Sequence, residues 1–247
     1  EKLNKENLLR FEDHKDNLFY MIKNNDLYKS LIKDISKNKF FSKRLIKNES
    51  SFKKILKDNK YDLIINCESN NYLSKKFFTK KINKNYNNLA YTTILKHEKL
   101  DNNSAIQTFT KFGPIAFLPI SEFETSVVCS LDTEIKKYSE KQVYDLININ
   151  NPKFKIKKFL KLDCFNLNSS ILRNYYYKNI LAFGDLLHKV HPLAGQGFNM
   201  TIRDLKTISK IIKNKIDLGL QLDSTIFEEF EQETKHLNFT FSSGIDF

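Results

Sequence analysis

The chain has 247 residues and a mass of 29.2 kDa, which is enough for one large domain or two small ones with a buried core. Apolar residues make up 40% and charged residues 28%, and no stretch approaches 18 consecutive apolar residues, so the sequence contains neither a membrane-spanning helix nor a signal-peptide core. The net charge of +12 is carried mostly by lysine, with only four arginines. Because Arg is the usual bidentate reader of phosphate and guanine, this charge indicates a solvated surface and argues against a nucleic-acid partner.

The three cysteines, Cys67, Cys129 and Cys164, are far apart in the sequence and form no CxxC pair. This spacing excludes a recognisable zinc site and argues against a disulfide scaffold. We therefore expect no metal site and a reducing, cytoplasmic compartment. The chain starts at Glu1 rather than at a methionine, and we interpret it as processed, trimmed or partial.

The elements expected in the first third are one long helix and one short strand. Helical spacing of Leu27, Leu31 and Ile35 predicts one amphipathic helix over 17–46. Residues 51–60 read as a short connection into the β-branched run 61–67, which is typical of a buried strand. A turn is expected at 69–71.

Residues 86–165 predict a mostly antiparallel sheet. Extended stretches alternate there with Asn, Asp and Pro, at 88–96, 105–112, 115–120, 125–131 and 154–162. The apolar residues Val143, Leu146 and Ile147 predict a helix over 139–147 inserted in this sheet.

The last part of the chain carries the strongest candidate site. An apolar strand at 179–183 runs into Gly184-Asp185, and a helix begins at Gly195-Gln196-Gly197. The apolar stripe expected to face the core consists of Phe198, Ile202, Leu205, Ile208 and Ile212. A closing helix is predicted over 224–247, with Phe227, Phe230 and Leu237 on its apolar face.

This strand–loop–helix arrangement suits an anionic or electron-rich ligand. Unpaired N–H groups and the positive dipole end of a helix lie at its first turn, and Asp185 at the carboxyl end of a strand can accept hydrogen bonds from a sugar hydroxyl. Each element also has a simpler explanation: Gly-Asp as a turn, the glycines as a helix start, and His188 and His191 as surface or capping residues.

The combination GDLLHKVHPLAGQGFNMTIRD at 184–204 resembles the signature of the ubiquinone-biosynthesis hydroxylases, which are FAD-dependent aromatic-ring monooxygenases. Residues 105–109 and 113–119 are similar to the family's strand pair that leads towards the flavin, and 8–11 and 20–27 to its segment entering the first long helix. The family's first βαβ unit, with the GxGxxG that holds the FAD pyrophosphate, has no counterpart in this sequence.

The resemblance implies an α/β (α+β) fold of the aromatic-hydroxylase type. It would comprise a partial three-layer FAD/NAD(P)-binding domain and an inserted, mostly antiparallel substrate-binding sheet. The expected division is 1–85 for the remaining part of the FAD-binding domain, 86–168 for the substrate-binding sheet, and 169–247 for the Gly-Asp segment with the closing helices.

The resemblance also implies FAD as cofactor, NAD(P)H as reductant, and hydroxylation of an aromatic ring in a prenylated phenol or quinone precursor. Asp185 would contact the sugar or ribitol hydroxyls, and the residues after the loop would line the isoalloxazine ring. No protein nucleophile is implied. The residues carried over are Asp185, Pro192, Gly195, Gln196, Gly197, Phe198 and Asn199.

Three departures from the family pattern keep alternatives open. Glu68-Ser69 stands where the family has Asp-Gly, Leu186 and Leu187 are bulky neighbours of Asp185, and Thr201 stands where a Gly is typical. One alternative is a non-catalytic relative that acts as a binding or scaffold component of a quinone-synthesis complex. Another is a basic protein that binds anionic surfaces, and a peripheral membrane contact through Lys75, Lys76, Lys80 and Lys81 is compatible with the hydroxylase hypothesis as well.

Overall fold

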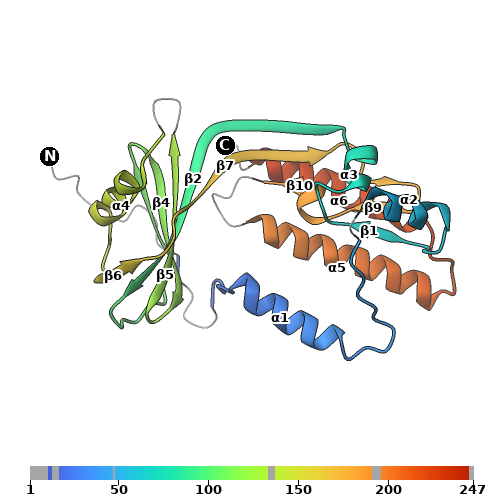
Figure 1. The fold of residues 1–247 in the computed structure, drawn as a ribbon, viewed down its shortest axis with the longest axis horizontal. Coiled ribbons are helices and arrows are strands. Elements are labelled where there is room, and N and C mark those ends of the chain that lie inside the picture. The colour runs from blue at the N-terminus through green and yellow to red at the C-terminus, as the bar shows by residue number, and fades with distance from the viewer. Residues whose placement is uncertain (1–10, 13–16, 47, 133–136, 191–195, 245–247) are drawn as a thin grey trace.

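The computed structural model describes residues 11–12, 17–46, 48–132, 137–190 and 196–244, and it has two lobes (Figure 1). The sheet lobe holds most of an antiparallel sheet and α4, and the helical lobe holds a small mixed sheet, α2, α3, α5 and α6. The helices are α1 (Asn24–Ile35), α2 (Glu49–Lys57), α3 (Tyr72–Phe77), α4 (Glu140–Ile149), the 3-10 helix η1 (Gly184–Leu186), α5 (Gln196–Asp217) and α6 (Thr225–Gly244). The strands are β1 (Ile64–Asn66), β2 (Lys81–His97), β3 (Ile106–Thr110), β4 (Gly113–Ser121), β5 (Glu124–Asp132), β6 (Ile156–Phe159), β7 (Asp163–Leu172), β8 (Tyr176–Tyr177), β9 (Ile180–Ala182) and β10 (His188–Lys189).

The large sheet has the strand order β10-β7-β2-β5-β4-β3, with β6 also paired to β2, and its pairings are antiparallel. This confirms the predicted fold class. Side chains alternate across the pleat, so one face of the sheet packs on α4 in a core that includes Leu95, Phe117, Val127 and Ile147. Helix α4 starts at a capping box in which Ser139 and Gln142 satisfy each other's backbone N–H groups, as its sequence favours.

Two long strands, β2 and β7, connect the lobes (Figure 1). They pair from Lys81 with Leu172 to Thr92 with Asp163, and the register shifts between Asn85 and Asn88, where Asn87 has a positive φ of 55°. Such a bulge bends a strand and increases its twist. The expected domain limits, between 85 and 86 and between 168 and 169, lie inside these two strands, and the three-part division stays a prediction.

The helical lobe is built on the small sheet β1-β9-β8, in which β1 and β9 are parallel. Helices α5 and α6 pack side by side against it. Its core is formed by apolar side chains from the small sheet, from α3, α5 and α6, and from the segment that connects β9 to β10: Leu73, Leu181, Phe183, Leu186, Leu187, Ile208, Ile211, Phe227 and Phe230.

Two expectations for the first third are wrong. Residues 51–60 are mostly helical, since α2 covers 49–57 with Asn48 as its N-cap and packs Phe52 and Leu56 against the helical-lobe core. The helix expected over 17–46 is shorter, since α1 begins at Asn24 and ends at Ile35. Just beyond it, the side chain of Asn38 accepts a hydrogen bond from the Phe40 backbone N–H, which offers the chain a turn in place of a further helical turn.

The apolar stripe expected on the helix after Gly197 is also partly wrong. Ile208 is buried, but Phe198, Ile202 and Leu205 are 55%, 48% and 49% exposed. In its first turns α5 instead buries Met200 and Asp204. Met200, Asp204 and Ile208 follow one another at intervals of one helical turn and so lie on the same face. On α6, Phe227 and Phe230 are buried as expected, whereas Leu237 is exposed.

Candidate cofactor site

The candidate site begins where β9 ends, at the turn that contains Asp185. Gly184 has a positive φ of 60°, and its carbonyl accepts a hydrogen bond from the Leu187 backbone N–H at 2.9 Å, which closes a single turn of 3-10 helix. Asp185 is exposed, while Leu186 and Leu187 are buried in the core. In the described part of the chain, the Asp185 carboxylate has no hydrogen-bond or ion-pair partner. The turn therefore exposes one carboxylate to solvent, while the two residues that follow it are buried in the core.

Leu186 and Leu187, the bulky neighbours of Asp185 that depart from the family pattern, are buried. Both side chains belong to the core of the helical lobe, so they do not crowd the surface that Asp185 faces. Thr201, the other unusual residue, donates a hydrogen bond from Oγ1 to the Gly197 carbonyl at 3.2 Å, within its own helix.

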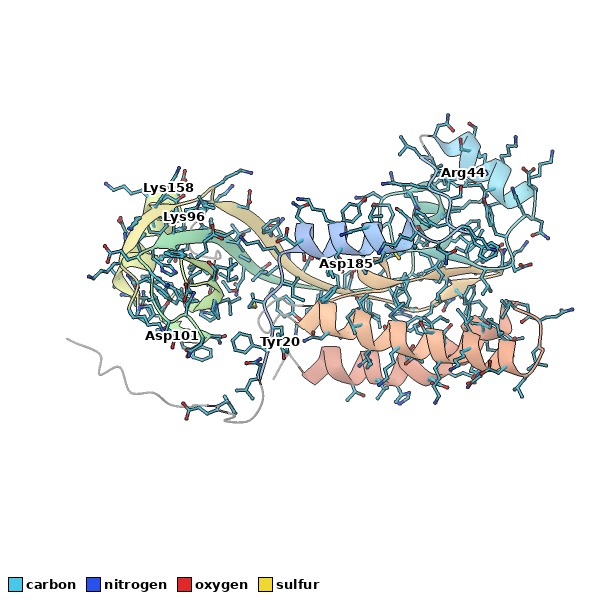
Figure 2. All side chains as sticks on the ribbon, turned by 90° about the horizontal axis from the view of Figure 1, so that it is seen from below. Tyr20, Arg44, Lys96, Asp101, Lys158 and Asp185 are labelled. Atoms are coloured by element: carbon cyan, nitrogen blue, oxygen red, sulfur yellow. The ribbon has the colours of Figure 1, made fainter. Side chains whose placement is uncertain are left out.

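The first turns of α5 lie directly against the Asp185 turn. A Cβ atom placed on Gly184 would lie 3.9 Å from Cγ2 of Thr201, and one on Gly197 would lie 3.5 Å from Cγ2 of Val190. Both distances are ordinary van der Waals contacts, so the start of α5 packs directly against the turn and against the residue that follows β10. The exposed Asp185 carboxylate and the start of α5 therefore belong to one surface region, which Figure 2 places near the middle of the molecule's long axis.

The structure brings part of the predicted site together. Phe198 and Asn199 are exposed and Gly197 is half-buried on the first turn of α5. Gln196 is the first residue of α5, and its side chain lies outside the described structure. Pro192 and Gly195, together with His191, lie outside the described residues, so the geometry of that loop remains a prediction.

The carboxyl end of β1 lies beside this turn. The Phe183 backbone N–H donates to the Asn66 carbonyl at 3.0 Å, which places Cys67 close to Asp185. Partial desolvation raises the pKa of the Cys67 thiol although the residue as a whole is exposed, and the negative charge of Asp185 raises this pKa further. The thiol is thus held in its protonated form near the carboxylate.

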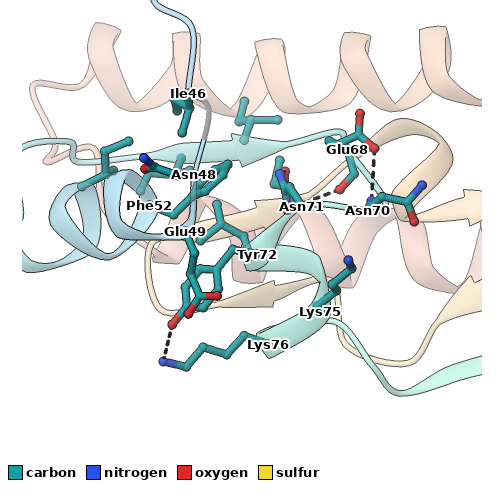
Figure 3. A pocket seen from close by; sticks show the side chains of 15 residues that line it. Ile46, Asn48, Glu49, Phe52, Glu68, Asn70, Asn71, Tyr72, Lys75 and Lys76 are labelled. Carbon is teal, nitrogen blue, oxygen red and sulfur yellow. Dashed lines mark hydrogen bonds between the residues drawn. The ribbon is translucent and has the colours of Figure 1, made fainter.

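A pocket of about 940 Å³ opens at the same end of β1, between α2, α3 and the free edge of that strand (Figure 3). Glu68 and Asn71 line it, but both have structural partners: Glu68 Oε1 accepts a hydrogen bond from the Asn70 backbone N–H, and Asn71 caps α3. None of the residues predicted to hold the cofactor lines this pocket. The Glu68-Ser69 departure from the family pattern therefore lies in a turn that stabilises itself.

The site also includes a buried polar pair that sequence reasoning missed. His188 was expected at the surface or at a cap, yet it is 1% exposed, and its Nε2 lies 2.7 Å from Oδ2 of Asp204, which is 0% exposed. A signal was available in the sequence, because Asp204 lies four residues from both Met200 and Ile208 and hence on the same face of α5. A carboxylate on an apolar stripe requires a buried partner.

The sheet lobe presents a second, more open face towards the helical lobe (Figure 1). Ile115, Phe117 and Val127 point into the core with α4, so their neighbours Ala116 and Val128 lie on the opposite face, where both are half-buried. Phe165 of β7 pairs with Ala90 of β2 on that face and is 56% exposed. This open face consists largely of small and apolar side chains.

Two features are absent from the described residues. No group of three His, Cys, Asp or Glu side chains among them is placed to hold a metal ion. Likewise, none of the helices in the described ranges is long and apolar enough to cross a membrane.

The fold and this site define a flavoprotein module. A sequence model of the FAD-binding domain family matches residues 81–217, more than half of the chain and a range that contains both the Asp185 turn and α5, so the chain belongs to that family. FAD is the cofactor of this family. Two features of the site suit FAD chemically. The Asp185 carboxylate after β9 can accept hydrogen bonds from hydroxyl groups of the cofactor, and the exposed first turn of α5 offers N–H donors.

The chain is similar to ubiquinone biosynthesis monooxygenase COQ6 of Dictyostelium discoideum, with 27% identity over 74% of this chain and 48% of that protein. It is 28% identical to 3-demethoxyubiquinol 3-hydroxylase of Escherichia coli, over 58% of this chain and 38% of that protein. The chain thus spans about half the length of the curated relatives it matches, or less.

Solved structures share the fold at low identity. The myxobacterial halogenase CndH superposes with a TM-score of 0.60 and 16% identity, over 74% of this chain and 46% of that one. The p-nitrophenol 4-monooxygenase PnpA of Pseudomonas putida gives a TM-score of 0.59 and 13% identity, over 74% and 48%. These likenesses confirm the aromatic-hydroxylase type of fold.

Proposed function

We propose that this chain is part of an FAD-dependent monooxygenase that hydroxylates an aromatic ring of a prenylated quinone precursor in ubiquinone biosynthesis. The observation that carries the proposal is the juxtaposition of the Asp185 turn and the start of α5 within the segment that matches the FAD-binding domain family. The functions of the COQ6 and Escherichia coli relatives support the reaction and the pathway. In this reaction one oxygen atom of O₂ enters the ring, the other leaves as water, and NAD(P)H supplies two electrons.

The protein's own residues bind and orient the cofactor. Asp185 accepts hydrogen bonds from sugar or ribitol hydroxyls, and because its carboxylate has no competing partner in the described structure, it is available to them. The first turn of α5, from Gln196 to Asn199, would hold the edge of the cofactor that becomes negative on reduction, because N–H groups at the start of a helix can stabilise such a charge. Pro192 and Gly195 complete the predicted lining. FAD supplies the redox chemistry when it is bound.

A large, apolar substrate suits the surfaces on either side of this site. The open face of the sheet offers Ala116, Val128 and Phe165, and α5 exposes Phe198 and Ile202. An aromatic head group attached to a prenyl chain can bury apolar area on both. The sheet thus forms the floor of the substrate site in this proposal.

Contact with a membrane is part of the same proposal, because a prenylated substrate resides in lipid. Lys75, Lys76 and Lys80 are exposed around α3, next to the stacked rings of Phe77 and Tyr177, whose centroids are 4.4 Å apart. Lysines attract anionic headgroups, and aromatic rings prefer the lipid–water interface. Liposome pelleting tests this contact. A bound fraction that rises with the content of anionic lipid supports it, and a bound fraction that does not depend on lipid charge contradicts it. Membership in a quinone-synthesis complex stays a prediction from the family resemblance.

The reaction is tested on the chain preceded by the N-terminal part of a relative. This protein is incubated with FAD, NAD(P)H, ¹⁸O₂ and a prenylated phenol, and the product is analysed by mass spectrometry. Incorporation of one labelled oxygen supports the proposal. Bound flavin without any hydroxylated product, across several prenylated phenols, would instead indicate the non-catalytic relative.

A further inference from the structure

A network of buried polar side chains lies directly behind the Asp185 turn. His188 on β10 and Asp204 on α5 are joined by the 2.7 Å contact between Nε2 and Oδ2, and both side chains are almost completely buried. The second carboxylate oxygen of Asp204 accepts a hydrogen bond from Arg203 Nη2 at 3.0 Å. Asn238 of α6 lies 3.4 Å from Asp204 and 3.3 Å from the Tyr175 hydroxyl, so the network continues into the last helix.

The pair formed by His188 and Asp204 connects the two elements of the candidate cofactor site. His188 follows Asp185 by three residues, and Asp204 follows Asn199 by five residues along α5. The imidazole–carboxylate contact therefore fixes the distance between the Asp185 turn and the first turns of α5. Neither side chain reaches the surface that Asp185 and Asn199 share, because both are buried.

Stability alone does not explain this pair. Removing charged or polar groups from water is unfavourable, and buried ion pairs are often no better for stability than apolar residues of the same size. In addition, Nδ1 of His188 is buried and has no hydrogen-bond partner in the described part of the chain, which adds a further desolvation penalty. Apolar residues at both 188 and 204 would avoid these two costs. What the pair does provide is a fixed geometry for two otherwise separate backbone elements.

We propose that His188 and Asp204 are positioning residues for FAD, which hold the Asp185 carboxylate and the start of α5 at the separation that the cofactor requires. This inference rests on the proposed function, since it assigns a role to residues next to the same site. It predicts that loss of the pair weakens FAD binding more than it weakens the fold.

The test compares three variants, each made in the chain preceded by the N-terminal part of a relative, by FAD affinity, thermal unfolding and hydrogen exchange. His188→Leu is expected to bind FAD at least tenfold more weakly and to speed amide exchange in residues 184–190. His188→Gln, which places an amide N–H near the position of Nε2, is expected to restore affinity to within threefold. The matched control is His97→Leu in the sheet lobe, where a histidine 2% exposed bonds Thr125 Oγ1 at 3.0 Å. His97→Leu is expected to lower the melting temperature without changing FAD affinity.

The outcomes separate the inference from the proposed function. A folded His188→Leu protein with wild-type FAD affinity and wild-type exchange at 184–190 overturns the inference alone. If the wild type takes up no FAD, the proposed function fails, whereas the exchange rates still decide whether the pair fixes the turn. If His188→Leu does not fold, Asp204→Asn replaces it, because it keeps the side-chain shape, and the same loss of affinity is expected.

Discussion

Gly184 lies beside Thr201, and a Cβ atom placed on the glycine would make an ordinary contact of 3.9 Å with the threonine methyl carbon. The Asp185 turn therefore packs against the first turns of α5. The space would admit an alanine, but the φ of +60° at Gly184 would not accept one without strain.

Gly184→Ala is therefore expected to lower stability by about 1–2 kcal/mol through backbone strain, and to weaken FAD binding because the turn carrying Asp185 must shift. Thermal unfolding and FAD titration measure the two effects. Gly219→Ala is the matched control, since Gly219 has a φ of +67° with nothing within 4 Å of its Cβ position and lies at the far end of α5. A similar loss of FAD affinity in both variants would contradict the role given to the Asp185 turn.

The Cys67 thiol reports on Asp185 without any cofactor. Because the Asp185 charge contributes to the raised pKa of Cys67, Asp185→Asn is expected to lower that pKa and to speed alkylation by iodoacetamide at pH 8. The measurement uses a Cys164→Ser background, which removes the other exposed thiol. Asp217→Asn, at the end of α5, serves as the control and should leave the rate unchanged. An unchanged rate in Asp185→Asn would show that the two side chains are not close.

Cys129 is expected to limit stability in alkaline solution. Burial raises the pKa of its thiol from 9.0 to about 12, so the folded state keeps the proton that the unfolded state loses. The stabilisation is complete below pH 9 and is lost as pH rises from 9 towards 12, by up to about 1.4 kcal/mol per pH unit. Denaturant unfolding of Cys129→Val should match the wild type at pH 8 and lose less stability above pH 9. Identical pH profiles would refute this account.

Glu124 connects the start of α1 to the sheet. A hydrogen bond and the charge of Lys23, at 2.7 Å, lower the pKa of the Glu124 carboxyl, so the contact is present above pH 4.5 and is lost as pH falls through the lowered value. Lys23→Gln should raise this pKa towards 4.5, as measured by carboxyl NMR titration. Lys99→Gln, which removes the contact with Glu122, is the control and should not move it. No change in Lys23→Gln would mean that the contact does not persist in solution.

Local sequence patterns were sufficient for much of the fold. Alternating strands, the Ser139 capping box and the strand ending at Gly184-Asp185 are local features, and the structure has them. The orientation of α5 was not predictable, because Phe198, Ile202 and Leu205 form an apolar stripe yet remain exposed. Periodicity identifies an apolar face but does not say which partner covers it.

The candidate site was predictable only in part, for the same reason. Asp185 was placed correctly at a strand end, since a Gly-Asp after an apolar run marks such a turn. The buried pairing of His188 with Asp204 depends on how β10 packs against α5, 16 residues apart in sequence. The burial of Leu186 and Leu187 likewise follows from tertiary packing, which no local sequence pattern determines.

FAD is proposed to bind at the Asp185 turn, and flavin absorbance between 300 and 550 nm tests this binding most directly. The chain preceded by the N-terminal part of a relative is mixed with FAD, freed of excess and scanned, next to its Asp185→Ala variant. We expect a retained flavin spectrum in the first protein and at least a tenfold loss of affinity in the variant. Because the Asp185 carboxylate has no hydrogen-bond or ion-pair partner within the described residues, the substitution removes the contact with FAD and no structural contact. Equal flavin retention by both proteins, or none by either, would contradict the account.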